Sequence, residues 1–483
     1  MNAPTTNPTA RAGGNAMKKR MALLDGGFIR MDRTESPQHG TVTIVFRIPD
    51  GSDDGFPLRL ADTMRQHAAT GARFNWVLST DFVDNLFPAW KIVSPNEIDL
   101  DFHFRVARVS APGGETEFAE IVSRISAVPL DMSRPAWEVH LITELSDRRF
   151  AILLKMHHAI VDGMTILQTM IEWLSADPAA TDTPPLWAFG VPDVPATAAA
   201  TEPNSRGALA SIRDAASSLA AVAGAAKATI NAARHRRNDG LHAPYAVPKM
   251  AFNKTITPDR SISMTVLDQS KFKAVASDIG GTLNDAVGVV LGTALRRYLA
   301  DVDERPDRSL VAGVLTSLRT AVETTAGGNV ISFIFADLAT DTDDIADRAQ
   351  RVVRSTRAGK EHLLGLGKNA MRYSMMMLLP YIVANITGTG HRMPLYNIAV
   401  SNLPGSRGPL YLNGAAAEAM HPTTIIYNGA AVVLVIISWN GKLCFTFNSC
   451  PTAVPRSDRL GAYLADAIAT IEGSSVSTSL RGD

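Results

Sequence analysis

The sequence predicts an α/β protein in which two halves each combine a mixed sheet with helices. Segments that alternate like half-buried strands and segments with the apolar spacing of helices follow one another along the whole chain. Between the halves, residues 175–208 are rich in Pro, Ala and Thr, as is typical of a linker. A chain of 483 residues, 46% of them hydrophobic, is long and apolar enough to form two domains of ordinary size.

The same signals give the expected domain boundaries. We expect a disordered tail at residues 1–16, with Met17 as an alternative start, and a first half at 17–190. A linker with an Ala-rich connecting helix is expected at 191–247, and a second half at 248–483. The tail lacks the apolar core of a secretory signal. Two cysteines, Cys444 and Cys450, cannot staple a fold of this size, so a reducing cytosol is the expected compartment.

The elements of the first half are predicted from periodicity. "TVTIVFRI" at 41–48 alternates as a strand does, and "FAEIVSRIS" at 118–126 has helical spacing. Strands are predicted at 137–145 and 149–157, on either side of the polar turn Ser146-Asp147-Arg148. A helix is predicted at 163–174.

The second half shows the same mixture. A helix is predicted at 283–300, with Asn284 or Asp285 able to cap it. Strands are predicted at 261–268, 309–319, 330–338, 396–405, 430–438 and 442–449. The apolar stretch "MMMLLPYIVANITG" at 375–388 fits either a core helix or a surface helix that touches lipid. The core interpretation is favoured, since apolar helices are usually buried.

Charge and hydropathy exclude two classes of protein. Lys plus Arg and Asp plus Glu number 47 each, so no bulk attraction to nucleic acid is expected. No stretch reaches the length of a membrane span.

The segment "LLKMHHAIVDG" at 153–163 places two histidines at the end of a predicted strand. A metal site is disfavoured, because neighbouring strand residues point to opposite faces and no second Cys/His cluster is present. A structural interpretation remains open, in which Asp162 caps the next helix and the histidines are core residues. The third interpretation is general-base catalysis by a neutral imidazole. Alternation lets only one histidine face the reaction, and the chain has no G-x-S-x-G nucleophile elbow.

Seven blocks in the same order resemble the bacterial wax ester synthase/acyl-CoA:diacylglycerol acyltransferase family. The resemblance runs from about Met21 to Ser449. The blocks are "LDFHFRVARVSAPGG" (100–114), "PLDMSRPAWEVHLI" (129–142), "HHAIVDG" (157–163), "PPLW" (184–187), "LNDAVGVVLGTALRRYL" (283–299), "GNVISFIFADLATD" (328–341) and "AVSNLPGSRGPLYLNGA" (399–415).

The resemblance implies two chloramphenicol-acetyltransferase-like domains, with the active site in a tunnel at their interface. It also implies transfer of a long-chain acyl group from acyl-CoA to a fatty alcohol or a diacylglycerol, with His158 as the general base. Acyl-CoA would be a co-substrate, and no other cofactor and no metal is expected. The expected setting is the cytoplasm, at the surface of the inner membrane or of lipid droplets.

The resemblance assigns the remaining motif residues less directly. His157 is expected to support the loop and Asp162 to hold it through an ion pair, with Arg134 and Arg319 as candidate partners. Gly163 would allow close backbone approach, and Trp187 would be structural. Asn284 and Asp285 match a second motif, for which a helix cap is the simpler role. Ser401 and Asn402 are candidate oxyanion donors.

Two alternatives and one departure stay open. The same fold could act on another acceptor alcohol, or the protein could be a catalytically silent acyl-CoA-binding or lipid-droplet protein. The family's usual "P-M-H-V-G" reads "PQHGTV" at 37–42, with Gln38 before His39. If this segment lines the acyl tunnel, the preferred chain length would differ from that of relatives.

Overall fold

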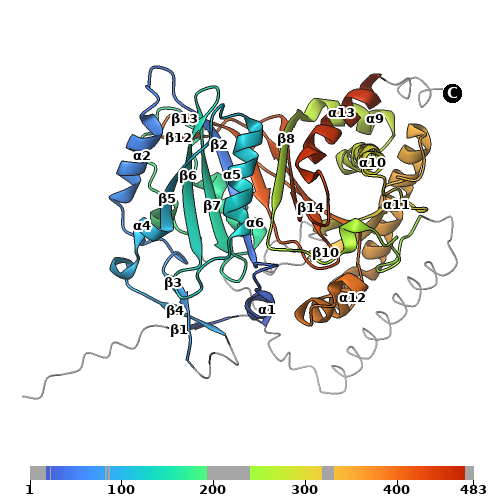
Figure 1. Ribbon diagram of the computed structural model, residues 1–483, viewed down its shortest axis with the longest axis horizontal. Helices are drawn as coiled ribbons and strands as arrows, with labels where there is room; N and C mark the ends of the chain where they lie inside the picture. The colour runs from blue at the N-terminus through green and yellow to red at the C-terminus, as the bar shows by residue number, and fades with distance from the viewer. Residues whose placement is uncertain are drawn as a thin grey trace, which may run out of the picture.

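The computed structural model of the protein describes residues 18–21, 23–81, 84, 88–192, 240–317 and 331–473. The predicted tail, the Ala-rich connecting helix and Arg319 lie outside the described residues. The described part contains two six-stranded sheets and a small three-stranded sheet, with helices packed around them (Figure 1). This is the mixed α/β architecture that the sequence predicts.

The first six-stranded sheet has the order β12-β13-β2-β7-β6-β5. Its strands are β2 (His39–Arg47), β5 (Phe104–Arg108), β6 (Trp137–Leu145), β7 (Arg149–His157), β12 (Tyr411–Leu412) and β13 (Ala415–Thr423). Only β5 and β6 pair in parallel in this sheet, so it is mixed. The predicted strands at 137–145 and 149–157 have the bounds of β6 and β7.

The second six-stranded sheet has the order β10-β9-β11-β14-β15-β8. Its strands are β8 (Ser261–Asp268), β9 (Val311–Ser317), β10 (Ile331–Asp337), β11 (Ile398–Leu403), β14 (Val432–Trp439) and β15 (Lys442–Ser449). The central β14 is a nearly continuous apolar run because it is buried on both faces of the sheet. The small sheet joins β1 (Lys18–Arg20), β4 (Ala89–Ile92) and β3 (Trp76–Leu78).

Helices flank the sheets, and α5 lies in front of the first sheet while α10 and α13 lie by the second (Figure 1). The helices are α1 (Leu23–Met31), α2 (Phe56–Arg65), α4 (Leu100–His103), α5 (Glu115–Ala127), α6 (Gly163–Glu172), α7 (Leu186–Phe189), α9 (Gln269–Asp278), α10 (Leu283–Asp301), α11 (Ile345–Leu366), α12 (Ala370–Ile386) and α13 (Leu460–Gly473). Short 3₁₀ turns lie at Pro95–Glu97, Ala251–Asn253, Gly367–Asn369, Gly390–Arg392 and Ser457–Arg459.

One crossing strand ties the two halves of the chain together. Strand β13 comes from the second half of the sequence, yet it pairs antiparallel with β2, from Arg47 opposite Ala416 to Thr41 opposite Thr423. In Figure 1 it lies beside the blue strand β2, at one side of the first sheet. The first sheet therefore draws on both halves of the sequence, and β13 also contacts β14 and β15 of the second sheet along its length.

Helix α12 is a surface helix, which corrects the favoured interpretation of 375–388 as a core helix. Tyr381 and Ala384 are buried, but the other face exposes Met375, Leu379, Val383 and Ile386. These four residues are spaced so that they share one side of a helix. No helix within the described residues is long and apolar enough to cross a bilayer.

Candidate active site

The two histidines of "HHAIVDG" sit where β7 ends. His157 is the last residue of the strand and lies opposite His39 of β2. The backbone N–H of His158 still donates to the carbonyl of Gln38, at 2.8 Å. The chain then turns, with the N–H of Ile160 donating to the carbonyl of His157 at 3.0 Å. Because side chains alternate along a strand, the two rings leave the chain toward different neighbours.

The ring of His157 is held by a hydrogen bond within its own loop. It is 1% exposed, and its Nδ1 accepts the backbone N–H of Ala159 at 3.0 Å. A nitrogen that accepts a hydrogen bond carries no proton, so the proton of the neutral ring is on Nε2. That Nε2 lies 3.5 Å from Oδ2 of Asp32, longer than a good hydrogen bond, and it has no shorter partner within the described residues. His157 thus has no free lone pair for a substrate.

The ring of His158 lies in a different environment. It stacks on Phe28 of α1, with 5.4 Å between ring centroids. Its Nε2 lies 3.4 Å from Oγ1 of Thr424, and a Cβ on Gly40 would come within 3.3 Å of the same nitrogen. Burial, followed by the neighbouring His157, lowers the pKa of His158 to about 4. The ring is therefore neutral near pH 7 and able to accept a proton.

Asp162 caps a helix instead of forming the expected ion pair with Arg134. Its Oδ1 accepts the N–H of Thr165 at 2.9 Å and its Oδ2 accepts the Thr165 hydroxyl at 2.7 Å. This is the arrangement of an N-cap, and it fixes the start of α6 directly after the histidine loop. Arg134 pairs with Asp99 at 3.1 Å, so it is not the partner of Asp162. Arg319 lies outside the described residues.

Gly163 and Trp187 occupy contrasting positions. Gly163 begins α6 and is exposed, and among the described residues nothing lies within 4 Å of where its Cβ would be. The close approach to the backbone of Gly163 that was expected from the sequence is therefore not made by any described residue of the protein. Trp187 is 1% exposed; its Nε1 donates to the carbonyl of His67 at 2.9 Å, and its ring lies near that of Trp137. These contacts agree with a structural role for Trp187.

The second motif forms a helix start in the other half. Thr282 is the N-cap of α10, and the carboxylate of Asp285, three residues on, accepts the N–H of Thr282 at 2.7 Å. The predicted cap at Asn284 or Asp285 is thus shifted to Thr282, in a capping box. Asp285 is buried and also accepts the hydroxyl of Thr356 in α11. Its contacts are those of a residue that joins two helices.

The structure joins Asn284 to one of the candidate oxyanion donors. The Nδ2 of Asn402 donates to Oδ1 of Asn284 at 2.6 Å, so the start of α10 is tied to β11. Ser401 precedes Asn402 in β11 and is buried. None of the hydrogen bonds found for these residues in the described part of the chain reaches His158. The motif at 157–163 and the residues Asn284 and Asn402 therefore form two separate clusters of contacts.

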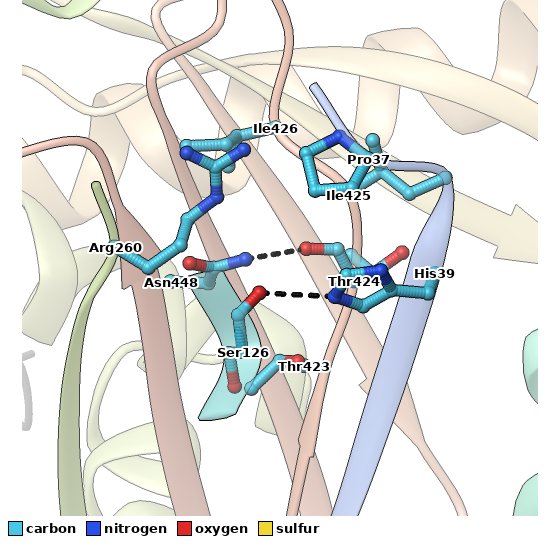
Figure 2. A pocket seen from close by; sticks show the side chains of 9 residues that line it. All are labelled: Pro37, His39, Ser126, Arg260, Thr423, Thr424, Ile425, Ile426 and Asn448. Carbon is cyan, nitrogen blue, oxygen red and sulfur yellow. Dashed lines mark hydrogen bonds between the residues drawn. The ribbon is translucent and has the colours of Figure 1, made fainter. Parts of the chain in front are cut away.

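A small pocket lies between the halves, next to Thr424 (Figure 2). It is lined by Pro37, His39, Ser126, Arg260, Thr423, Thr424, Ile425, Ile426 and Asn448. The carbonyl of Thr424 accepts Nδ2 of Asn448 at 2.7 Å, while its hydroxyl faces His158. Oδ1 of Asn448 is buried and has no hydrogen-bond partner among the described residues. One threonine thus connects the histidine of the first half to a polar pocket made by both halves.

Arg260 joins the second half to the loop before β2. Its guanidinium donates to the carbonyl of Glu35 at 2.9 Å and to that of Thr257 at 2.7 Å. Burial lowers the pKa of this guanidinium to about 10. The hydrogen bond from Arg260 to Glu35 thus ties the loop that carries Asp32 and Gln38 to the second half of the chain.

Sequence reasoning missed Phe28, Asp32 and Thr424, which contact the histidine pair. These contacts are tertiary, and nothing in local periodicity points to them. Gln38, marked only as a departure from the family pattern, proves to hold the backbone of His158. Within the described residues, no three His, Cys, Asp or Glu side chains gather as metal ligands would.

Comparison with known proteins gives a consistent result. Residues 21–287 match the family described as "Wax ester synthase/diacylglycerol acyltransferase catalytic domain", and residues 327–472 match the "WS/DGAT C-terminal domain". A putative diacylglycerol O-acyltransferase of Mycobacterium tuberculosis is 32% identical over 467 residues, covering 94% of this chain and 99% of the relative. A putative diacylglycerol O-acyltransferase of Mycobacterium bovis is 31% identical over 462 residues, covering 94% and 99%.

Solved structures agree on the fold. The wax ester synthase/diacylglycerol acyltransferase of Marinobacter aquaeolei matches with a TM-score of 0.74 and 27% identity, covering 94% of this chain and 98% of the other. The first condensation domain of the calcium-dependent antibiotic synthetase matches with a TM-score of 0.55 at 15% identity, covering 94% and 97%, which supports the fold alone. The chain therefore belongs to the wax ester synthase/diacylglycerol acyltransferase family.

Proposed function

We propose that the protein transfers a long-chain acyl group from acyl-CoA to the hydroxyl of a fatty alcohol or a diacylglycerol. The observation that carries this proposal is the contrast between the two histidines. His158 is a neutral imidazole held at the junction of the halves, whereas the lone pair of His157 is used within its own loop. One ring is thus available as a base, and the other is a support.

The proposed reaction is a direct transfer. His158 takes the proton of the acceptor hydroxyl as the oxygen attacks the thioester carbonyl. The tetrahedral intermediate collapses, the C–S bond breaks, and the thiolate of coenzyme A leaves with the proton returned by His158. Acyl-CoA acts as a co-substrate, and no step needs a metal or a further cofactor.

The choice of acceptor rests on the relatives. Those from Mycobacterium carry the name diacylglycerol O-acyltransferase, and the Marinobacter protein is named for both wax ester and diacylglycerol chemistry. Both acceptors are therefore part of the proposal. Another acceptor alcohol, or a silent acyl-CoA-binding protein, remains the competing account.

A thiol-release assay separates these accounts. Palmitoyl-CoA is supplied with hexadecanol, with dipalmitoylglycerol, or with no acceptor, and the product is identified by its mass. Release that depends on either acceptor supports the proposal. Tight binding of palmitoyl-CoA without thiol release would favour the silent binding protein. Thiol release only with a different alcohol would mean that this alcohol, and not a fatty alcohol or a diacylglycerol, is the acceptor.

The lipid setting is the second part of the proposal. Long-chain alcohols and diacylglycerols reside in membranes and droplets, and α12 exposes an apolar stripe at Met375, Leu379, Val383 and Ile386. Helix α12 packs against α1, whose Phe28 stacks on His158. We infer peripheral attachment through this stripe, at the surface of a membrane or a lipid droplet.

A further inference from the structure

We propose that Asp32 is the positioning residue of the histidine pair. This inference rests on the proposed function and adds a residue to it. Asp32 lies in the loop between α1 and β2, and its side chain is only 20% exposed. One carboxylate oxygen faces the ring of His157, and the other holds the backbone segment that binds His158. One carboxylate thus reaches both histidines.

The first link is to the ring of His157. Because the N–H of Ala159 donates to Nδ1, the proton of His157 is on Nε2, and that N–H is buried. Oδ2 of Asp32, 3.5 Å away, is the acceptor that faces it. A buried N–H without an acceptor is costly. The nearby carboxylate therefore stabilises the tautomer that the N–H of Ala159 fixes, and it favours this orientation of the ring.

The second link is to the backbone of His158. Oδ1 of Asp32 accepts the N–H of Gln38 at 2.9 Å, and the carbonyl of Gln38 accepts the N–H of His158 at 2.8 Å. Gln38 is fully buried; its side chain donates to the carbonyl of Ser36 at 2.7 Å and accepts the hydroxyl of Tyr427 at 3.2 Å. Gln38 is therefore fixed on several sides, and Asp32 acts on His158 through a single residue.

Through these contacts Asp32 holds the histidine loop in place, which is the role that was expected of Asp162. Asp162 uses both of its oxygens on Thr165, at the start of α6. Asp32 instead stands at the strand end from which both rings project. Since a misplacement of about 1 Å at a catalytic group costs up to about 10²-fold in rate, a residue that fixes both rings affects turnover without touching substrate.

The test is Asp32→Asn. The amide oxygen can still accept the N–H of Gln38, but the amide NH₂ then opposes the Nε2–H of His157. We expect kcat to fall about 10-fold to 10²-fold, while KM for palmitoyl-CoA and the melting temperature stay close to those of the wild type. The matched control is Glu35→Gln in the same loop, where, among the described residues, the carboxylate pairs with the exposed Arg33 at 3.8 Å. The control is expected to keep wild-type kcat.

A double-mutant cycle shows whether Asp32 acts through His157. In a His157→Ala background, Asp32→Asn should cost no more than about two-fold, because the partner of the carboxylate is already gone. A full and additive loss in that background would overturn the inference. So would wild-type kcat in Asp32→Asn, or a loss of melting temperature with unchanged kcat per folded molecule. A wild-type protein without acceptor-dependent thiol release would contradict the proposed function itself.

Discussion

Burial decides the chemistry of His158. Its pKa is lowered to about 4, mainly because the charged ring would be desolvated. At pH 7 the ring is neutral and ready to accept a proton, but a base with so low a pKa is a weak one. In the proposed mechanism, the orientation of the ring would therefore contribute much of the rate, and Gln38, Thr424 and Phe28 set that orientation.

This pKa predicts the acid side of the pH–rate profile. An unperturbed histidine would lose activity below about pH 6.5. Because only the neutral ring is a base, kcat should instead stay level down to about pH 5 and fall through the pKa of about 4. The measurement is kcat from pH 4 to 8, with circular dichroism at each pH to confirm folding. An inflection near 6.5 in folded protein would contradict the low pKa.

The sequence could point to His158 but not to its surroundings. The strand that ends at the histidine pair has a clear local pattern, and alternation separates the two rings. Asp32 lies far from His157 along the chain, so their contact arises only when β2 pairs with β7. The cap at Asp162 was one of the local alternatives, and the structure supports that one over an ion pair with Arg134.

At the scale of elements, strong local patterns were reliable. Strands β6, β7, β8 and β15 have the predicted bounds because apolar runs there end at polar turns. Strand β13 was not predicted. Its sequence, "AAAEAMHPT", is rich in alanine, which has weak strand preference, and its pairing with β2 is set by tertiary structure. The crossing that completes the first sheet was therefore invisible to periodicity.

The proposed attachment to lipid can be tested at the exposed face of α12. Leu379→Glu and Val383→Glu replace side chains that are 57% and 51% exposed, so folding should be little affected. Each should weaken binding to phosphatidylcholine vesicles containing diacylglycerol by about 10-fold to 10²-fold, because burial of one such side chain contributes ~1.5–3 kcal/mol. Vesicle sedimentation measures the binding.

The control for α12 is Leu364→Glu on α11, which changes a leucine that is 66% exposed but outside the stripe. It should leave binding unchanged. Salt at about 1 M should not release the wild-type protein, since screening weakens charge interactions and not apolar ones. Complete release by salt, or equal losses in all three variants, would rule out attachment through α12.

At the scale of the whole molecule, the site belongs to both halves. His158 comes from the first half, and Thr424, directly after β13 in the second half, lies 3.4 Å from its Nε2. Arg260, also from the second half, binds the carbonyl of Glu35 in the loop before β2. The family resemblance implied a site at the interface of the halves, but the contact between His158 and Thr424 could only be located in three dimensions.

Direct transfer predicts a ternary complex. With palmitoyl-CoA and hexadecanol varied together, double-reciprocal plots of initial rate should intersect. A covalent acyl-enzyme would instead give parallel lines, and quenching without acceptor would trap an acylated protein detectable by mass. Parallel lines together with such an adduct would mean that a side chain other than His158 carries the acyl group.

Buried neutral histidines predict sensitivity of the whole fold to acid. The pKa values of His158 and His421 are both lowered by burial to about 4, and that of His39 is also well below its ordinary value. Between these values and about pH 6.5, the unfolded chain binds more protons than the folded protein. The free energy of unfolding should be full above pH 6.5 and fall as the pH drops toward 4. Urea unfolding at several pH values checks this, and a constant free energy down to pH 4.5 would contradict it.

The central claim is that one histidine is the base and the other its support. The measurement is kcat for acyl transfer by His158→Ala and His157→Ala, side by side, with thermal melting of each. We predict that His158→Ala loses about 10²-fold or more with its fold intact, since the base is gone. His157→Ala should melt at a lower temperature and lose less activity, with partial recovery in His157→Asn or His157→Gln. An equal collapse of kcat in His157→Ala, with an unchanged melting temperature, would mean that both rings take part in the chemistry and would contradict the account.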